Sequence, residues 1–372
     1  MPFSTYMQWA LHDPEHGAYG SGRLRVGKAG DFATSPSLGP DFAALLAPQI
    51  AQWLQGQPPE APLALVETGP GEGQLALELA EALQVHWPNL AARTQLVLVE
   101  PNVGMAERQR QRLLHCPLPC RWLSFEQLAA DPPMGVMLAH EVLDALAVER
   151  IVWDGALWRR QGVALHGDAV AQPLLRLEAG EPLPPPWLAQ LEPLGLAEPG
   201  PQRPPGWTTE LHRGLDPWLQ QAGNALVSGQ LLVVDYAHEA WRYYALQRSN
   251  GTLMAYRQQQ ASDDPLRDPG HWDLTAHLCL EAVVAAAEAG GWRLLGQRRQ
   301  GEALLALGLA ERLHGLQQQD PSQLPQLLNR REALLRLVDP IALGDFRWLA
   351  FERKAPADAA PSLFLQDPSP TW

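Results

Sequence analysis

The chain has 372 residues, of which 46% are hydrophobic and 19% are charged, and its formal net charge is −13. This composition excludes an intrinsically disordered chain, and the negative charge disfavours non-specific binding to nucleic acid and to anionic membranes. No stretch reaches 18 consecutive apolar residues, so we expect no membrane insertion.

The cysteine content indicates a reducing compartment. Cys116, Cys120 and Cys279 cannot all pair within one chain, and their spacing matches no zinc motif. The opening residues lack the basic and apolar segments of a secretion signal. We therefore expect reduced thiols, no metal site and a cytoplasmic protein.

The first part of the chain predicts helices around a long loop. Apolar residues at helical spacing indicate a helix over residues 3–11, which should end before Asp13. Residues 17–40 are rich in glycine and show no sustained periodicity, which predicts a loop of a length that is often functional. Helical spacing resumes over residues 41–55. We expect residues 1–60 to form a helical cap with an active-site loop.

From residue 61 short apolar strands alternate with helices. This alternation predicts a parallel sheet that is covered on both faces. Helices are expected at residues 73–85, 102–114 and 276–289. Strands are expected at residues 63–67, 95–100, 119–123, 135–141, 229–236, 292–298 and 346–353.

Other segments interrupt the alternation. Residues 147–172 read as two or three antiparallel strands, and residues 182–206 are proline-rich and a poor candidate for regular core. A helix is predicted at 208–222. We expect one main domain over residues 61–355, with insertions at about 150–206 and at 237–276. The second insertion reads as irregular. Residues 356–372 are expected to form a disordered or loosely packed tail.

A glycine-rich turn follows the first of these strands. The sequence LVETGPGEG places an acid at Glu67 and glycines at positions 69, 71 and 73. A dinucleotide fingerprint would need its third glycine at position 74, and a P-loop would need Gly-Lys-Ser/Thr. Both are excluded. Glycines at such a turn let a ligand approach the backbone closely, although they could also serve only to make a tight turn.

A second acid, Glu100, ends the next strand. The combined pattern resembles the S-adenosylmethionine (SAM) site of class I methyltransferases. By this resemblance Glu67 would bind the ammonium group of SAM, and Glu100 would accept hydrogen bonds from the ribose hydroxyls. The cofactor-binding residues that it implies are Glu67, Gly69, Pro70, Gly71, Gly73, Glu100, Pro101 and Ser124.

Further segments resemble, in chain order, the MidA-like methyltransferases, the family of the mitochondrial complex I assembly-factor arginine methyltransferase. They include GDF at 30–32, AHEVLDALAVER at 139–150, LLVVDYAHE at 231–239 and the long stretch from GTLMAYR to DLTAH at 251–277. The resemblance implies an α/β, Rossmann-like class I methyltransferase fold, with a mostly parallel seven-stranded sheet, an N-terminal helical cap and insertions. It also implies SAM as cofactor and a protein substrate with a target arginine.

Carboxylates are expected at the reaction centre, because an arginine guanidinium is protonated and binds them as a fork. Glu141 and Asp144 follow the fourth strand, although Asp144 could instead favour a helix N-terminus, and His277 could instead be a cap or core residue. The catalytic residues that we expect are Asp31, Glu141, Asp144 and His277. Those expected at the substrate are Tyr19, Phe32, Thr34, Ser35, Asp235 and Tyr236.

Four positions depart from the family pattern. His140 stands where the family usually has Asn, Ala43 where it usually has Gly, and Ser37 and Ala44 where it usually has Glu. Two alternatives therefore stay open. One is a methyltransferase that acts on an oxygen or nitrogen of a small molecule, and the other is a SAM-binding assembly factor without activity.

Overall fold

The computed structural model describes residues 1–27, 30–31, 34–167, 174–197, 202–354 and 360–367. The chain divides into two compact units, each built from separate stretches of sequence. The sheet unit comprises Arg25–Val142, Trp218–Tyr236 and Ala286–Trp372, and the small unit comprises Met1–Leu24, Leu143–Pro217 and Ala237–Ala285.

The expected cap over residues 1–60 is divided between these units. Helix α1 (Phe3–His12) belongs to the small unit and α2 (Asp41–Gln55) to the sheet unit. Both helices lie where the apolar spacing predicted them. The chain crosses from one unit to the other within the predicted loop, between Leu24 and Arg25.

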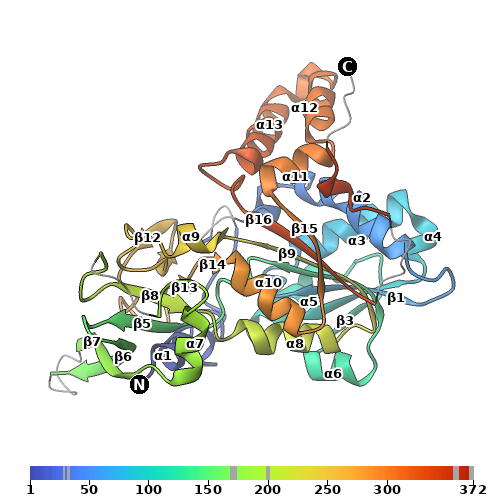
Figure 1. The fold of residues 1–372 in the computed structure, drawn as a ribbon. Coiled ribbons are helices and arrows are strands. Elements are labelled where there is room, and N and C mark those ends of the chain that lie inside the picture. Colours follow the sequence, from blue (N-terminus) through green and yellow to red (C-terminus); the bar gives the residue numbers. More distant parts are fainter. Residues whose placement is uncertain (28–29, 32–33, 168–173, 198–201, 355–359, 368–372) are drawn as a thin grey trace. The chain divides into compact units, whose positions relative to one another are not determined.

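The sheet unit contains one seven-stranded sheet in the order β15-β16-β9-β4-β1-β2-β3 (Figure 1). Neighbouring strands are parallel, except that β16 is antiparallel to both β15 and β9. The predicted mostly parallel seven-stranded α/β fold is confirmed. Its strands are β1 (Leu63–Thr68), β2 (Thr94–Val99), β3 (Cys120–Trp122), β4 (Met134–His140), β9 (Ser228–Asp235), β15 (Arg293–Arg299) and β16 (Arg347–Arg353).

The strand order reverses at β1, which has β2 on one side and β4 on the other. Open α/β sheets bind ligands at the carboxyl ends of the strands beside such a reversal. All six residues of β1 are buried, as expected for a strand that is covered on both faces. The ends of β1, β2 and β4 therefore mark the position of the site.

Helices α2 and α3 (Gln74–His86) form the main core with the sheet. Leu46 and Ile50 of α2 belong to the same buried cluster as Leu65 of β1 and Leu79 of α3. The other helices of the sheet unit are α4 (Pro88–Ala91), α5 (Val103–Arg112), α6 (Phe125–Ala130), α11 (Gln300–Ala306), α12 (Leu309–Gln317) and α13 (Leu324–Val338), with 3-10 turns η1 (Pro36–Leu38), η2 (Pro321–Gln323) and η3 (Leu363–Leu365).

The small unit is built on an antiparallel sheet in the order β7-β6-β5-β8, as the pattern over residues 147–172 predicted for its first two strands. Two helices, α8 (Leu215–Asn224) and α10 (Leu280–Ala289), cross the boundary between the units. The remaining elements are β5 (Glu149–Trp153), β6 (Trp158–His166), β7 (Leu174–Pro182), α7 (Pro185–Leu191), β8 (Thr208–Leu211), β10 (Ala237–His238), α9 (Ala240–Tyr243), β11 (Met254–Arg257), β12 (Gln260–Ser262), β13 (Asp273–Thr275) and β14 (Leu278–Cys279).

Three predictions were wrong in this unit. The proline-rich segment contains α7, and its Leu191 and Leu196 are fully buried in a cluster with Trp158 and Trp207. The helix expected from residue 208 begins at Leu215, because residues 208–211 pair with β5 instead. The stretch that reads as irregular forms the sheet β12-β11-β13, in which β11 pairs with the neighbouring β12 and with β13 further along the chain.

Part of the expected loose tail is packed. Phe364 has no exposed surface, and its ring centroid lies 5.5 Å from that of Trp348 and 6.2 Å from that of Trp53. Its backbone N–H donates to Oε1 of Gln49. The apolar residues of η3 therefore anchor residues 360–367 to the core of the sheet unit.

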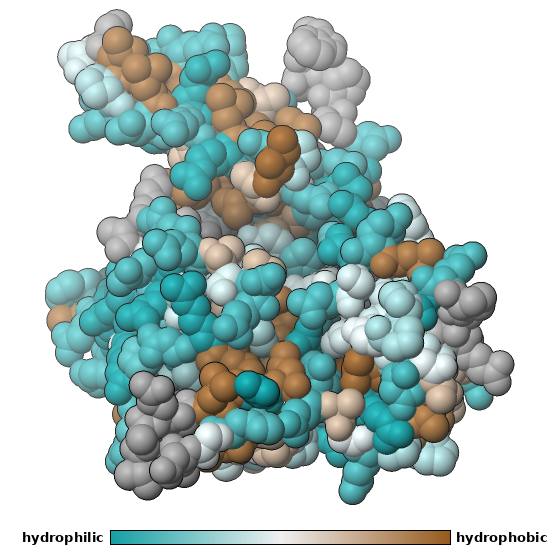
Figure 2. Space-filling model, turned by 90° about the vertical axis from the view of Figure 1, so that its left-hand side faces the viewer, coloured by the Kyte–Doolittle hydropathy of each residue, from teal (hydrophilic) through white to brown (hydrophobic). Residues whose placement is uncertain are grey.

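The face of the molecule drawn in Figure 2 is mostly hydrophilic, with hydrophobic patches between polar residues. Within the described part of the chain, every helix is too short or too polar to cross a membrane.

Candidate functional site

The turn between β1 and α3 has an unusual backbone. Gly69, Gly71 and Gly73 have φ angles of +56°, +53° and +78°, which residues with a Cβ rarely adopt. A Cβ on Gly69 would lie 2.9 Å from the Val142 side chain, whereas one on Gly71 would meet its nearest neighbour at 3.8 Å. As far as the described residues show, space is therefore open above Gly71, where a ligand could approach the backbone.

Glu67, near the end of β1, is a buried carboxyl group with an unused oxygen. It accepts a hydrogen bond from the backbone N–H of Ala76 in α3. No group among the described residues bonds to its Oε2, and the residue is only 4% exposed. Burial raises the pKa of Glu67 to about 8. An unsatisfied buried acceptor costs about 1–3 kcal/mol, so this position fits the ammonium group of a ligand.

Glu100, directly after β2, has a carboxylate that is held from two sides. Oε1 accepts from the backbone N–H and the side-chain amide of Asn102, both at 2.9 Å, and Oε2 accepts from Nε2 of Gln109 at 3.0 Å. Burial raises the pKa of Glu100, and these hydrogen bonds and the charge of Arg108 oppose the shift. A carboxylate has about four acceptor sites, so Oε2 keeps one for a further donor.

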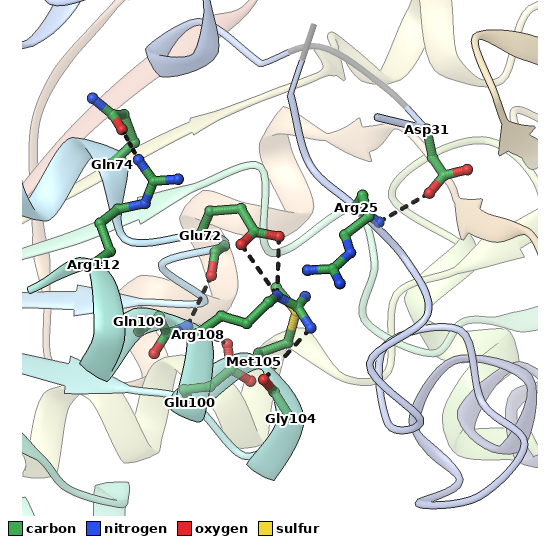
Figure 3. A network of polar contacts seen from close by, with 11 residues as sticks. Arg25, Asp31, Glu72, Gln74, Glu100, Gly104, Met105, Arg108, Gln109 and Arg112 are labelled. Atoms are coloured by element: carbon green, nitrogen blue, oxygen red, sulfur yellow. Dashed lines mark hydrogen bonds and ion pairs between the residues drawn. The ribbon is translucent and has the colours of Figure 1, made fainter. Parts of the chain in front are cut away.

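Helix α5 is tied to the glycine turn through side chains (Figure 3). Nε of Arg108 lies 3.1 Å from Oε2 of Glu72, and Nε2 of Gln109 donates to the carbonyl oxygen of Gly71 at 2.9 Å. Arg112 bonds to Gln74 at the start of α3. The turn, Glu100 and α5 thus form one connected polar network.

Glu141, the residue after β4, has a strained backbone. Its φ is +53°, and a left-handed conformation in a residue other than glycine costs about 1–3 kcal/mol. The backbone N–H of Glu141 donates to the carbonyl oxygen of Val234 in β9 at 2.8 Å, which holds it in place. Strain of this kind is concentrated at active sites and ligand-binding sites, and here it lies at the carboxyl edge of the sheet.

His140 is the neighbour of Glu141 and is neutral. Its Nδ1 lies 3.5 Å from Oε1 of Glu141. Burial lowers the pKa of His140 to about 3. The ring lies edge-on to Phe42 and Phe346, with centroids 5.3 and 6.4 Å away. Glu141 therefore lies beside an uncharged aromatic ring.

The end of the adjacent strand supplies Asp235 and Tyr236. Asp235 is fully buried and accepts the backbone N–H of Tyr236 at 2.8 Å. The ring of Tyr236 lies edge-on to Phe346 at 4.0 Å. Because β4 and β9 are parallel, with His140 opposite Val234, these residues and Glu141 come from neighbouring strand ends at the same edge.

The loop residues of the sheet unit make contacts within the loop or with the core. Asp31 closes a turn: its Oδ2 accepts the N–H of Arg25 at 2.9 Å, as Figure 3 shows, and its own N–H donates to Arg25 O. The N–H of Thr34 donates to Oγ of Ser37, and Oγ of Ser35 bonds to the buried Gln300. Phe32 lies outside the described residues.

Two predicted cofactor residues have local structural contacts, and a third is exposed. Oγ of Ser124 accepts the N–H of Gln127, and the Gln127 side chain accepts the N–H of Ser124, so Ser124 caps α6. The carbonyl oxygen of Pro70 accepts the N–H of Gly73 within the turn. Pro101 is exposed.

The small unit contains Tyr19, Asp144 and His277. Tyr19 stacks on His12, with ring centroids 5.9 Å apart. Asp144 is buried, and its carbonyl oxygen accepts the N–H of Ala276. Nδ1 of His277 lies 2.9 Å from Nε2 of His238, and burial together with the charges around it lowers the pKa of His277 to about 3.

Sequence reasoning missed the side chains that link the site's polar network, among them Gln109 and Trp122. Gln109 has no exposed surface, and Trp122 donates from Nε1 to Oε1 of Gln109 at 3.0 Å. The available signal was weak: Gln109 lies on the helix that follows Glu100, and the rest of that helix is rich in arginine and glutamine.

Comparisons with known proteins agree with this geometry. Residues 45–298, more than half of the chain, match the family described as "Putative S-adenosyl-L-methionine-dependent methyltransferase". The chain is 28% identical over 344 residues to "Protein arginine methyltransferase NDUFAF7 homolog, mitochondrial" of Drosophila melanogaster, which covers 84% of this chain and 74% of that protein. It is 26% identical over 372 residues to the Mus musculus protein arginine methyltransferase NDUFAF7, and the match covers 92% of this chain and 78% of that protein.

A solved structure supports the same assignment. A protein of Burkholderia thailandensis, crystallised with S-adenosyl-homocysteine (SAH), superposes with a TM-score of 0.82 at 28% identity, covering 99% of this chain and 91% of that one. The match to this solved structure thus includes the residues that match the family. This chain belongs to the MidA-like family of SAM-dependent methyltransferases.

Proposed function

We propose that this methyltransferase acts on an arginine side chain of a protein. The observation that carries the proposal is Glu141, a strained and largely buried carboxylate at the carboxyl end of β4, beside a neutral His140. The Drosophila and mouse relatives are named protein arginine methyltransferases, which supports the same substrate class.

Three features of the sheet unit fit SAM. Glu67 would bind the ammonium group, and the glycine turn leaves its backbone open at Gly71. Oε2 of Glu100 would accept one ribose hydroxyl, and Oε1 could accept the other in place of the Asn102 side chain. When bound, SAM supplies an electrophilic methyl group on a positively charged sulfur.

Glu141 would do two things for an arginine substrate. Its carboxylate would bind the protonated guanidinium and orient one nitrogen for attack. It would then accept the proton that this nitrogen loses as the new N–C bond forms. The low polarity around His140, Phe42 and Phe346 strengthens such a charge pair. Asp31, Asp144 and His277 remain candidates on the basis of the family resemblance.

The partner we propose is a protein with a cationic target segment, and the family resemblance links it to assembly of a complex I-like dehydrogenase. The net charge of −13 favours encounter with a basic segment. We also propose a cytoplasmic location, for which the support is three free cysteines at positions 116, 120 and 279.

The test is to incubate the protein with methyl-labelled SAM and host lysate and to locate the label by mass spectrometry. We expect label on arginine of a protein, with much less in a Glu141→Gln sample. Label on a small metabolite would replace the proposal with the small-molecule alternative. Binding of SAH without any labelled product would favour the inactive assembly factor.

A further inference from the structure

Gln109 connects three segments of the SAM site through one side chain. It lies in α5 without exposed surface. Its Nε2 donates to the carbonyl oxygen of Gly71 at 2.9 Å and to Oε2 of Glu100 at 3.0 Å, and its Oε1 accepts from Nε1 of Trp122 at 3.0 Å. The glycine turn, the acid after β2 and strand β3 therefore share one amide group.

The chemistry of the three partners fixes which way this amide faces. An indole N–H can only donate, so it must meet the amide oxygen of Gln109. A carbonyl oxygen and a carboxylate can only accept, so Gly71 and Glu100 must meet the amide nitrogen. Turning the amide over would break all three hydrogen bonds. Trp122 thus keeps both N–H groups of Gln109 directed at the turn and at Glu100.

The carboxylate of Glu100 is consequently held at both of its oxygens. Asn102 bonds to Oε1, and Gln109 bonds to Oε2, which has an acceptor site left for a further donor. We infer that Gln109 is a positioning residue for the cofactor: it orients Oε2 of Glu100 toward the ribose and fixes the distance between Glu100 and the glycine turn. This inference rests on the proposed role of Glu100 as the ribose acceptor.

A purely structural role for Gln109 predicts a different result. The ion pair between Arg108 and Glu72 ties α5 to the same turn without Gln109, so the loss of the amide should leave the turn attached. If Gln109 only supported the fold, its replacement would weaken the binding of every ligand of the site alike. If Gln109 orients Glu100, the loss of affinity should depend on whether the ligand has ribose hydroxyls.

The experiment measures the affinity of the full chain for two probes by calorimetry: SAH and an SAH analogue that lacks both ribose hydroxyls. The main variant is Gln109→Leu. Its matched control is Gln111→Leu, because Gln111 lies on the same helix, is exposed, and donates from its side-chain amide to Oε1 of the exposed Glu107. Trp122→Phe is the second variant, since it keeps Gln109 and removes the N–H that orients it. Thermal unfolding without ligand checks that each variant is folded.

We expect Gln109→Leu to lower the affinity for SAH about tenfold, the order of one hydrogen bond to a charged group. Its affinity for the analogue should fall less than about threefold. Trp122→Phe should show a smaller loss with the same preference, and Gln111→Leu no loss. Equal losses for both probes, or none, in folded Gln109→Leu and Trp122→Phe proteins would overturn the inference.

Glu100→Ala separates this inference from the assignment on which it rests. If Glu100→Ala weakens SAH and Gln109→Leu does not, only the role of Gln109 fails. If Glu100→Ala binds SAH as tightly as the unmodified chain, the ribose assignment fails and the inference fails with it.

Discussion

Nδ1 of His140 lies 3.5 Å from Oε1 of Glu141, at the point where β4 ends and the backbone turns into a left-handed conformation. Because burial keeps the ring neutral at ordinary pH, the histidine adds no positive charge beside the carboxylate. The carboxyl group of Glu141 thus lies beside a neutral ring at the carboxyl edge of the sheet. We base the proposal of an arginine substrate on this arrangement.

The pKa of His140 predicts how acid affects the fold. Its value in the folded chain, about 3, is below the ordinary value of 6.5. The unfolded chain therefore binds a proton that the folded chain rejects, and stability falls as the pH decreases from about 6.5 toward 3. His140→Phe keeps a ring between Phe42 and Phe346 and should unfold at a lower pH. Circular dichroism during acid titration measures this, and an unchanged midpoint would contradict the neutral ring.

Glu67 should release a proton when the cofactor binds. Its pKa of about 8 means that it is mostly protonated at pH 7, and an ammonium group beside it favours the ionised form. We expect SAH binding at pH 7 to release about one proton per ligand. Calorimetry in buffers of different ionisation enthalpy measures this number. Glu67→Gln should abolish the release, and an equal release from both proteins would show that another group titrates.

The raised pKa of Glu67 also affects the stability of the protein without ligand. A carboxyl whose folded pKa is raised binds more protons in the folded chain than in the unfolded chain between about pH 4.5 and 8. The stability of the unmodified protein relative to Glu67→Gln should therefore decrease as the pH rises through this range. Denaturant titrations at pH 5 and pH 8 measure the free energy of unfolding of both proteins. If the stability of the unmodified protein relative to Glu67→Gln increased with pH, this would contradict a buried, unpaired Oε2 in Glu67.

Replacing Gly71 by Val should block the cofactor. The φ of +53° makes any side chain costly there, and a side chain at this position would fill space that the described residues leave open to a ligand. Gly195→Val is a matched control, because Gly195 has a φ of +65°, no described residue other than its chain neighbours lies within 4 Å of where its Cβ would be, and it lies outside the proposed site. Both variants should lose about 1–2 kcal/mol of stability, and only Gly71→Val should lose SAH affinity, by more than about 100-fold. Equal affinities in the two folded variants would place the cofactor elsewhere.

The sheet unit could be predicted because its pattern is local. Apolar strands and amphipathic helices alternate from residue 61, and the glycine turn has a sequence signature. Helix α2 was expected at residues 41–55 and is found at Asp41–Gln55. The acids Glu67 and Glu100 were identified because each ends a strand that the pattern itself revealed.

The small unit resisted prediction because its order depends on distant partners. Glu210 in β8 is fully buried, and its Oε2 accepts from the N–H of Thr252 and the hydroxyl of Tyr243. In sequence these residues read as a helix start and an irregular loop. Gln109 was missed for the same reason, since its partners Gly71 and Trp122 lie 38 and 13 residues away.

The central claim, methyl transfer to a protein arginine with Glu141 as the carboxylate, is tested most directly by single-turnover methylation of the target protein. Glu141→Gln keeps the shape of the side chain and removes its charge, and Glu107→Gln is the control on the exposed face of α5. We predict label on arginine, a rate at least about 100-fold lower for Glu141→Gln, unchanged SAH affinity in both variants and an unchanged rate for Glu107→Gln. Equal rates for Glu141→Gln and the unmodified enzyme, or label on a residue other than arginine, would contradict the claim.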